Sequence, residues 1–179
     1  MDIITFAFLL FATLIIAIDL AAIWWFGSML IPIIGGGGPY VPTRHDVASD
    51  MITIAELTSA DTVVDLGSGD GRLLIAAAKA GAGKSIGYEI HPGLVKLSRQ
   101  KAKRANVEDL IEIRKQSMWK ADLTGVTVVL LYQIPYAMEK LRDKIEQELP
   151  KGTRVVSHAF ELPGRKAVAK RGKAFLYTL

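Results

Sequence analysis

Three glycines at alternate positions follow a strand-forming stretch in the segment VVDLGSGDGR, residues 63–72. Two β-branched residues and an aspartate come before Gly67, and an alanine-rich run that favours a helix follows Arg72. A strand, a glycine turn and a helix in this order are typical of a site for a nucleotide-like cofactor, because glycine lets the backbone approach the ligand closely. The segment therefore predicts a site for either NAD(P) or S-adenosylmethionine (AdoMet).

The spacing of the glycines separates these two cofactors. The dinucleotide fingerprint is G-x-G-x-x-G, and its third glycine would fall where this chain has Arg72. Here the third glycine is Gly71, and Asp70 before it would place a carboxylate where a helix N-terminus binds pyrophosphate. AdoMet has no phosphate and carries a sulfonium and an ammonium, which tolerate acids around the loop. We therefore predict AdoMet as the cofactor.

Two acids at the carboxyl ends of predicted strands complete this site. Asp65 can anchor the methionine ammonium, although alone it could be a turn or capping aspartate, and Glu89 can accept hydrogen bonds from both ribose hydroxyls. NAD enzymes place an acid similarly, so Glu89 does not separate the cofactors. Ser117 and Met118 follow the third predicted strand, where such folds contact adenine, but a plain loop explains them equally well. The predicted cofactor residues from this pattern are Asp65, Gly67, Ser68, Gly69, Gly71, Glu89, Ile90, Ser117 and Met118.

Strands alternate with helices along the rest of the chain. Near-continuous apolar strands are typical of a parallel sheet with both faces covered. We expect strands at 62–66, 85–90, 111–115, 126–132 and 153–160, helices at 72–80, 94–105 and 138–149, and a hairpin across Arg171 and Gly172. Thr43 with Asp46 resembles a capping box before an earlier helix. The predicted fold class is α/β: a Rossmann-like, doubly wound, mostly parallel sheet with a C-terminal antiparallel hairpin, preceded by one N-terminal transmembrane helix.

A long apolar run opens the chain. From Ile3 to Phe26 it is interrupted by one charge, Asp19. A helix of this length rises roughly 36 Å, enough to cross a hydrocarbon core of about 30 Å. Trp24 and Trp25 fall where an interfacial aromatic belt is expected, and a proline at position 32 ends any helix. A cleaved signal peptide is the alternative, but such a peptide has a basic start that this run lacks.

Charge and composition restrict the partners and the chemistry. All Lys and Arg follow the apolar run, so the positive-inside rule predicts a single-pass membrane protein with its catalytic domain on the cytoplasmic, or equivalent, side. The net charge of +4 suits contact with anionic lipid or RNA. Nucleic acid is disfavoured, because no aromatic stacking platform is interleaved with the basic residues. The chain has no cysteine, which excludes thiolate metal sites and a cysteine nucleophile.

Four segments resemble a known family: PYVPT (39–43), VVDLGSGDGR (63–72), GYEIHP (87–92) and ELPKGTRVVSHAFELPG (148–164). Together they resemble the class I methyltransferases that modify protein lysines, namely the archaeal broad-specificity enzymes and the mitochondrial relatives that act on the adenine nucleotide translocase and the ATP synthase c-subunit. The resemblance implies that Tyr40, Pro42 and Thr43 close over the methionine end of AdoMet. The chain departs from the family pattern at His91, where Asn is usual, and at Ser117, where Asp or Asn is common.

The acceptor side is predicted from the segment YQIPY, residues 132–136. It resembles a decayed [DN]-P-P-[YF] signature of amino-group methyltransferases. Tyr132, Gln133 and Tyr136 are therefore candidate catalytic residues, although Tyr132 could simply be the last buried aromatic of its strand. His158, which ends the fifth strand, could take up a proton or line the pocket, and a hydrogen-bonded structural histidine is the alternative. A dry channel lowers the pKa of a substrate lysine, so a dedicated base is optional.

These inferences predict a membrane-anchored, AdoMet-dependent protein-lysine N-methyltransferase that transfers the methyl group in line to a deprotonated amine. The expected divisions are an N-terminal transmembrane anchor at 1–34, a glycine-rich joint and cofactor-closing segment at 35–42, and a methyltransferase domain at 43–179. The expected partners are a protein with an accessible lysine, including one associated with a membrane, and lipid around the anchor. A lipid or small-molecule N-methyltransferase and a non-catalytic AdoMet-binding module are the alternatives. No metal is expected.

Overall fold

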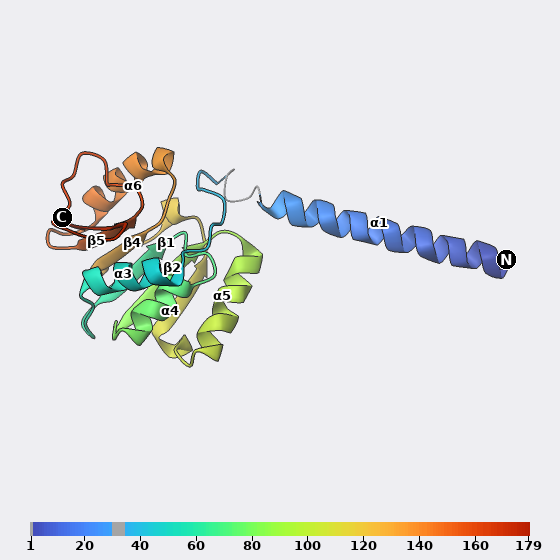
Figure 1. Cartoon of the computed structure of the whole chain (residues 1–179), viewed down its shortest axis with the longest axis horizontal. Helices are drawn as coiled ribbons and strands as arrows, with labels where there is room; N and C mark the ends of the chain where they lie inside the picture. Colours follow the sequence, from blue (N-terminus) through green and yellow to red (C-terminus); the bar gives the residue numbers. More distant parts are fainter. Residues whose placement is uncertain (1, 30–34) are drawn as a thin grey trace.

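The computed structural model describes residues 2–29 and 35–179. Two features expected from the sequence, the side chain of Trp25 and the helix-ending proline at position 32, lie outside the described residues. The described chain consists of one long helix, α1, and an α/β part that carries everything else (Figure 1).

Helix α1 runs from Ile3 to Met29, and its large apolar side chains between Ile3 and Trp24 are exposed. At its start, the carboxylate of Asp2 accepts a 2.7 Å hydrogen bond from the backbone N–H of Thr5, which satisfies one of the free donors of the first turn. Among the described residues, one helix is long and apolar enough to cross a membrane, over Ile3–Trp24. The same test is passed by N-terminal signal sequences.

The α/β part is built on a seven-stranded sheet in the order β3-β2-β1-β4-β5-β7-β6. The first five strands of this order are parallel, β7 is antiparallel to β5, and β6 is antiparallel to β7. This confirms the predicted fold class, including the C-terminal hairpin. The strands are β1 (Thr62–Leu66), β2 (Lys84–Glu89), β3 (Ile111–Lys115), β4 (Val128–Leu131), β5 (Arg154–His158), β6 (Ala169–Arg171) and β7 (Ala174–Thr178).

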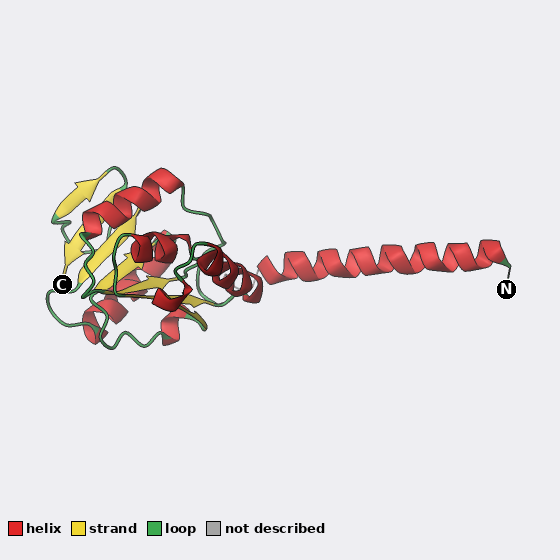
Figure 2. Cartoon of the chain, turned by 90° about the horizontal axis from the view of Figure 1, so that it is seen from below, coloured by secondary structure: helices red, strands yellow, loops and turns green. Residues whose placement is uncertain are grey.

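Helices cover both faces of the sheet (Figure 2). They are α3 (His45–Ala55), α4 (Arg72–Lys79), α5 (Pro92–Arg104) and α6 (Pro135–Glu148), with short 3₁₀ turns η1 (Glu108–Leu110) and η2 (Met118–Lys120). Val63 packs in one apolar core with α3 and α4, and its neighbour Val64 packs in the other core with α6. Because side chains alternate along a strand, a continuous apolar strand such as β1 fills both cores at once.

Helix α4 starts at Arg72 as expected, whereas α5 and α6 start three or fewer residues earlier than the expected positions 94 and 138. Helix α5 begins at Pro92, since Nδ1 of His91 accepts hydrogen bonds from the backbone N–H groups of Gly93 (3.1 Å) and Leu94 (3.3 Å). His91 therefore caps the helix as a short polar side chain would, which accounts for its place in a family pattern that has Asn. The prediction of a capping box at Thr43 is wrong. The N-cap position of helix α3 is Arg44, and no side-chain hydrogen bond caps the helix.

Candidate active site

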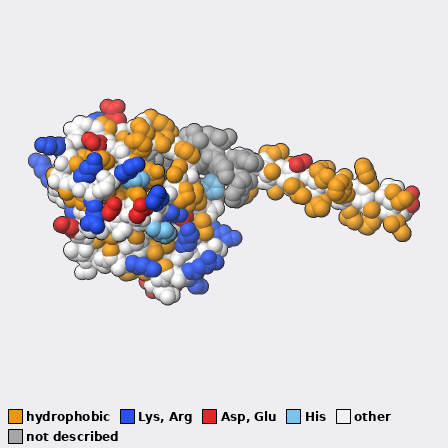
Figure 3. Space-filling view, in the orientation of Figure 1, with side chains coloured by type: hydrophobic (Ala, Val, Ile, Leu, Met, Phe, Trp, Pro, Cys, Tyr) orange, Lys and Arg blue, Asp and Glu red, His pale blue; other side chains and the backbone are white. Residues whose placement is uncertain are grey.

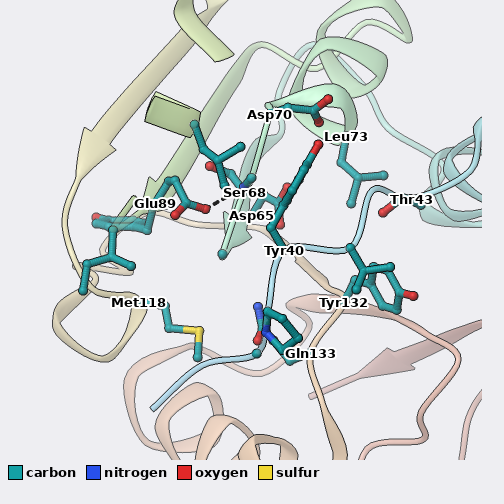
Figure 4. Close-up of a pocket in the computed structure, with 18 of the residues that line it drawn as sticks. Tyr40, Thr43, Asp65, Ser68, Asp70, Leu73, Glu89, Met118, Tyr132 and Gln133 are labelled. Carbon is teal, nitrogen blue, oxygen red and sulfur yellow. Dashed lines mark hydrogen bonds between the residues drawn. The ribbon is translucent and has the colours of Figure 1, made fainter. Parts of the chain in front are cut away.

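A cavity of about 270 Å³ opens at the carboxyl ends of β1, β2 and β4, where the strand order reverses on either side of β1 (Figure 4). Ligands of open α/β sheets bind at such a switch point. Most of the sequence-predicted residues line it: Tyr40, Pro42, Thr43, Asp65, Gly67, Ser68, Gly69, Glu89, Ile90, Ser117, Met118, Tyr132 and Gln133. The other three predicted residues, Gly71, Tyr136 and His158, are not among the lining residues.

The glycine turn shapes the floor of the cavity. Gly67, Gly69 and Gly71 all have positive φ angles, of 93°, 53° and 77°, which residues with a Cβ rarely adopt. A Cβ on Gly69 would also come within 2.9 Å of the Tyr40 ring. Gly71 instead caps α4 and packs against Ser98 of α5, so its role is to bring two helices together.

Two buried carboxylates face this one cavity. Asp65 is 3% exposed, and burial together with the charges of Glu89 and Asp70 raises its pKa to about 8. Glu89 accepts hydrogen bonds from the backbone N–H groups of Gly69 (2.8 Å) and His91 (2.7 Å), and burial raises its pKa as well. A cationic ligand would relieve the repulsion between these carboxylates, whereas a pyrophosphate would increase it. The lining thus fits the ammonium and sulfonium of AdoMet.

Asp70 has a different role from the one expected. Its carboxylate is buried and accepts hydrogen bonds from Arg72, at 2.8 and 2.7 Å, and from Lys101 of α5. These two cations hold its pKa well below the usual range. Asp70 is therefore charge-compensated and does not stand free to repel a phosphate. Its effect is to fix Arg72, whose guanidinium also donates to the backbone carbonyl of Thr43.

Residues 35–43, termed the strap, run across the mouth of the cavity. The indole N–H of Trp119 donates to the carbonyl of Gly35 (2.9 Å), and the hydroxyl of Tyr136 donates to the carbonyl of Gly37 (2.6 Å). The Tyr40 ring lies over the glycine turn (Figure 4). Tyr40, Pro42 and Thr43 thus line the cavity, and Tyr136 supports the strap from outside it.

The acceptor side of the cavity lies beyond the end of β4. The side-chain amide of Gln133 donates a 2.8 Å hydrogen bond to the carbonyl of Leu66, and Tyr132 lines the wall beside it. His158 lies behind Tyr132, with the two rings edge to face and their centroids 4.2 Å apart. His158 is 7% exposed, and neither ring nitrogen has a hydrogen-bond partner within residues 2–29 and 35–179. Burial and the charge of Lys173 lower its pKa.

The ANTKMT methyltransferase domain family model matches residues 65–169. The chain belongs to this family. It is 39% identical to a protein-lysine N-methyltransferase of Saccharolobus islandicus over 127 residues, which are 70% of this chain and 79% of that protein. It is 40% identical to the adenine nucleotide translocase lysine N-methyltransferase of Mus musculus over 111 residues, 62% of this chain and 48% of that protein. The chain thus spans about half the length of the mouse relative.

A solved relative carries the cofactor product. The crystal structure of an RNA methyltransferase from Salinibacter ruber in complex with S-adenosyl-L-homocysteine is 38% identical, with a TM-score of 0.74 over 77% of this chain and 93% of that one. This member of the ANTKMT family is accordingly an AdoMet-dependent methyltransferase, and the predictions of enzyme class and cofactor are confirmed.

Several lining residues were missed by sequence reasoning: Pro39, Val41, Arg72, Leu73, Tyr88, Leu94, Ile134 and Phe160. Most are apolar residues that a sequence pattern assigns to the core. Phe160 was placed inside a strand expected to run to 160, but β5 ends at His158 and Ala159 adopts a positive φ of 64°. That turn directs the chain so that Phe160 reaches the cavity. The one available signal was its position in the family-like segment 148–164.

Proposed function

We propose that this chain is a membrane-anchored protein-lysine N-methyltransferase. The observation that carries the acceptor assignment is the 39% identity to a protein-lysine N-methyltransferase across 79% of that protein. The acceptor wall agrees with it, because the side chains there, Tyr132, Gln133 and Phe160, are all neutral. A neutral, partly dry wall disfavours the charged ammonium of lysine and so raises the fraction of reactive amine.

The orientation of Gln133 gives it a role in this chemistry. The carbonyl of Leu66 can only accept, so the side-chain nitrogen of Gln133 must be the donor in their hydrogen bond. The side-chain oxygen of Gln133 is then turned to the other side of the amide, where it can accept an N–H from the substrate amine. Gln133 thus takes the place of the Asp or Asn that begins the [DN]-P-P-[YF] signature of amino-group methyltransferases.

The transfer itself needs positioning more than acid–base help. AdoMet supplies, when bound, a methyl group on a sulfonium. Asp65 binds the methionine ammonium, and Glu89 accepts hydrogen bonds from the ribose. Tyr132 and Gln133 hold the amine so that its lone pair faces the methyl carbon. The N–C bond forms as the C–S bond breaks, leaving a neutral thioether and a methylated ammonium, and the proton lost by lysine beforehand goes to water.

The anchor is the N-terminal segment 1–34. It is supported by the length, exposure and composition of α1, on which Asp19 is the one charged residue. Residues 35–42 connect it to the methyltransferase domain, 43–179, and close over the cofactor. The location of all Lys and Arg after the helix supports a single-pass protein with that domain on the cytoplasmic, or equivalent, side.

RNA is the second candidate acceptor, because the solved relative at 38% identity is titled an RNA methyltransferase. The two acceptors need different entrances. A lysine side chain fits a narrow neutral channel, whereas a nucleobase has to be extruded from its stack and held between aromatic faces. Tyr132 and Phe160 could supply such faces, so the product has to be identified directly.

The test uses the full chain in lipid nanodiscs with methyl-tritiated AdoMet, a membrane fraction and total RNA from the source cells. Label recovered as methyl-lysine in protein, and lost with Asp65→Asn, supports the proposal. Asp109→Asn, at an exposed acid of η1, is the matched control and keeps the label. Label in RNA or in lipid alone would replace lysine by that acceptor, and AdoMet binding without label in any fraction would indicate a non-catalytic module.

A further inference from the structure

Two lysines and two aromatic residues gather beside the start of the strap. Trp119 and Tyr136 bind the carbonyls at the start of the strap, as described above. The ammonium of Lys140 lies 4.4 Å from the centroid of the Trp119 ring, and Lys120 follows Trp119 directly in η2. We call Trp119, Lys120, Tyr136 and Lys140 the rim patch.

The rim patch presents uncompensated positive charge. Lys120 and Lys140 are both exposed, and neither forms an ion pair with any residue that the structure describes. The nearest acids in sequence are engaged elsewhere: Glu139 lies 3.7 Å from Arg142, and Asp122 accepts a hydrogen bond from Thr124. Tyr136 is 62% exposed, so the patch combines amphipathic aromatic rings with free ammonium groups.

The covalent chain keeps the rim patch close to the end of α1. Helix α1 ends at Met29, and Gly35, which Trp119 holds, comes six residues later. An extended chain of that length spans at most about 22 Å. If α1 crosses a membrane, Gly35 and the Trp119 side chain that holds it therefore stay within about this distance of the end of α1.

We propose that the rim patch binds the anionic headgroups of the membrane in which α1 is anchored. This contact turns the mouth of the active site toward the bilayer. This inference rests on the anchor in the proposed function. Tryptophan and tyrosine concentrate at membrane interfaces, and each lysine near an anionic surface adds favourable attraction to it. The phosphate of a lipid headgroup is the ligand that Lys120 and Lys140 recognise.

A lipid surface fits the patch better than the other polyanions. The two lysines lie beside the strap, which follows the apolar helix α1 in the chain. A bilayer that holds α1 is therefore already close to these lysines. Figure 3 shows other Lys and Arg side chains gathered over α5. The described residues of α5, however, form no hydrogen bond to the strap. Since Gly35 lines the catalytic cavity as well, headgroup contact at the rim patch also limits the acceptor to groups near the membrane surface.

The experiment compares lysine reactivity in the full chain held in two kinds of nanodisc. One kind contains phosphatidylcholine alone, and the other contains one-third phosphatidylglycerol. A water-soluble acylating reagent and mass spectrometry report the labelling of each lysine. We expect labelling of Lys120 and Lys140 to fall about fivefold in the anionic discs and to recover at high salt. The labelling of Lys79 and Lys151, which are exposed at the opposite end of the strands from the cavity, should not change.

A pair of matched double variants tests the cause. Lys115, at the end of β3 and five residues before Lys120, should share the protection in the wild-type chain, and in Lys120→Gln with Lys140→Gln its protection should disappear. It should persist in Lys79→Gln with Lys151→Gln, which removes the same charge from the opposite end of the strands. Equal labelling in both discs, an equal fall at all lysines, or protection that survives the first double variant would overturn the proposal.

Four further outcomes separate this proposal from its foundations. A chain that is not retained in either disc contradicts the anchor, and a retained chain without methyl transfer in the same discs contradicts the enzyme assignment instead. Protection of Lys120 and Lys140 by inorganic phosphate in detergent, without an effect of anionic lipid, would assign the patch to a free anion. Protection by added RNA alone would assign it to nucleic acid.

Discussion

The backbone N–H of Gly69 donates a 2.8 Å hydrogen bond to the carboxylate of Glu89, twenty residues later in the chain. This bond ties the glycine turn to the end of β2 and so sets the distance between the two parts of the cofactor site. A second oxygen of Glu89 is held by the backbone of His91. Both oxygens keep a lone pair for the ribose hydroxyls, because a carboxylate oxygen accepts more than one hydrogen bond.

Glu89→Ala should therefore weaken AdoMet binding by roughly 10-fold to 100-fold, the range for losing hydrogen bonds to a charged group. The dissociation constant is measured by isothermal titration calorimetry on the full chain in detergent. Glu108→Ala removes an exposed acid of η1 and is the matched control, with an unchanged constant. Unaltered affinity in the Glu89 variant would show that this carboxylate does not hold the ribose.

Asp65 gives the cofactor-free protein a distinct pH dependence. Its pKa is raised to about 8, so the folded state retains a proton that the unfolded chain releases near pH 4. Folding stability should consequently fall as pH rises from about 4 to 8. Asp65→Asn should raise the melting temperature at pH 7 by a few degrees and change it little at pH 4. If the melting temperatures of the two proteins differed by the same amount at every pH in this range, the prediction would be contradicted.

The affinity for AdoMet should also depend on the ionisation of Asp65, but it should increase with pH where the folding stability decreases. An ammonium favours the ionised carboxylate, so binding releases a proton from Asp65 below about pH 8. We expect affinity for AdoMet to increase from pH 6 to pH 8 and the heat of binding to depend on the ionisation enthalpy of the buffer. In Asp65→Asn both dependences should disappear, and a wild-type titration that is independent of buffer would contradict the assignment.

The cofactor loop and the sheet could be predicted because their causes are local. The glycines of the turn, the acids at strand ends and the apolar strands are all visible in short windows, and β1 and β3 begin and end where expected. The pairing of Asp70 with Lys101 could not be predicted in this way. It joins residues 31 positions apart through the packing of α5 on α4, which no local pattern specifies.

The strap and its supports show the same division. Tyr40 and Thr43 were found through a family-like segment, but Trp119 lies in no motif and is 84 residues away from the carbonyl it binds. Tyr136 and His158 were predicted as candidate catalytic residues, yet neither is among the residues that line the cavity. Sequence spacing brings a residue to the right strand end, but packing decides whether it reaches the ligand.

His158 should act as a positioning residue for Tyr132. The edge-to-face contact holds the Tyr132 ring, while neither His158 nitrogen has a hydrogen-bond partner among the described residues. His158→Ala should lower kcat about tenfold through the loss of that support, with little change in AdoMet affinity. His158→Phe should restore most of the rate, since an aromatic ring keeps the contact. A Phe variant as slow as the Ala variant would instead assign proton handling to the imidazole.

The strap should close the site through two independent hydrogen bonds. Trp119→Phe removes the donor to Gly35, and Tyr136→Phe removes the donor to Gly37. Each should weaken AdoMet binding about 3-fold to 10-fold, as expected for one neutral hydrogen bond, and the two effects should add because the donors do not share a partner. Tyr177→Phe is the matched control: the Tyr177 hydroxyl accepts from the backbone N–H of Leu162, and neither residue lines the cavity. This variant should lower the melting temperature without changing the dissociation constant, whereas unchanged binding in the strap variants would show that the strap does not retain the cofactor.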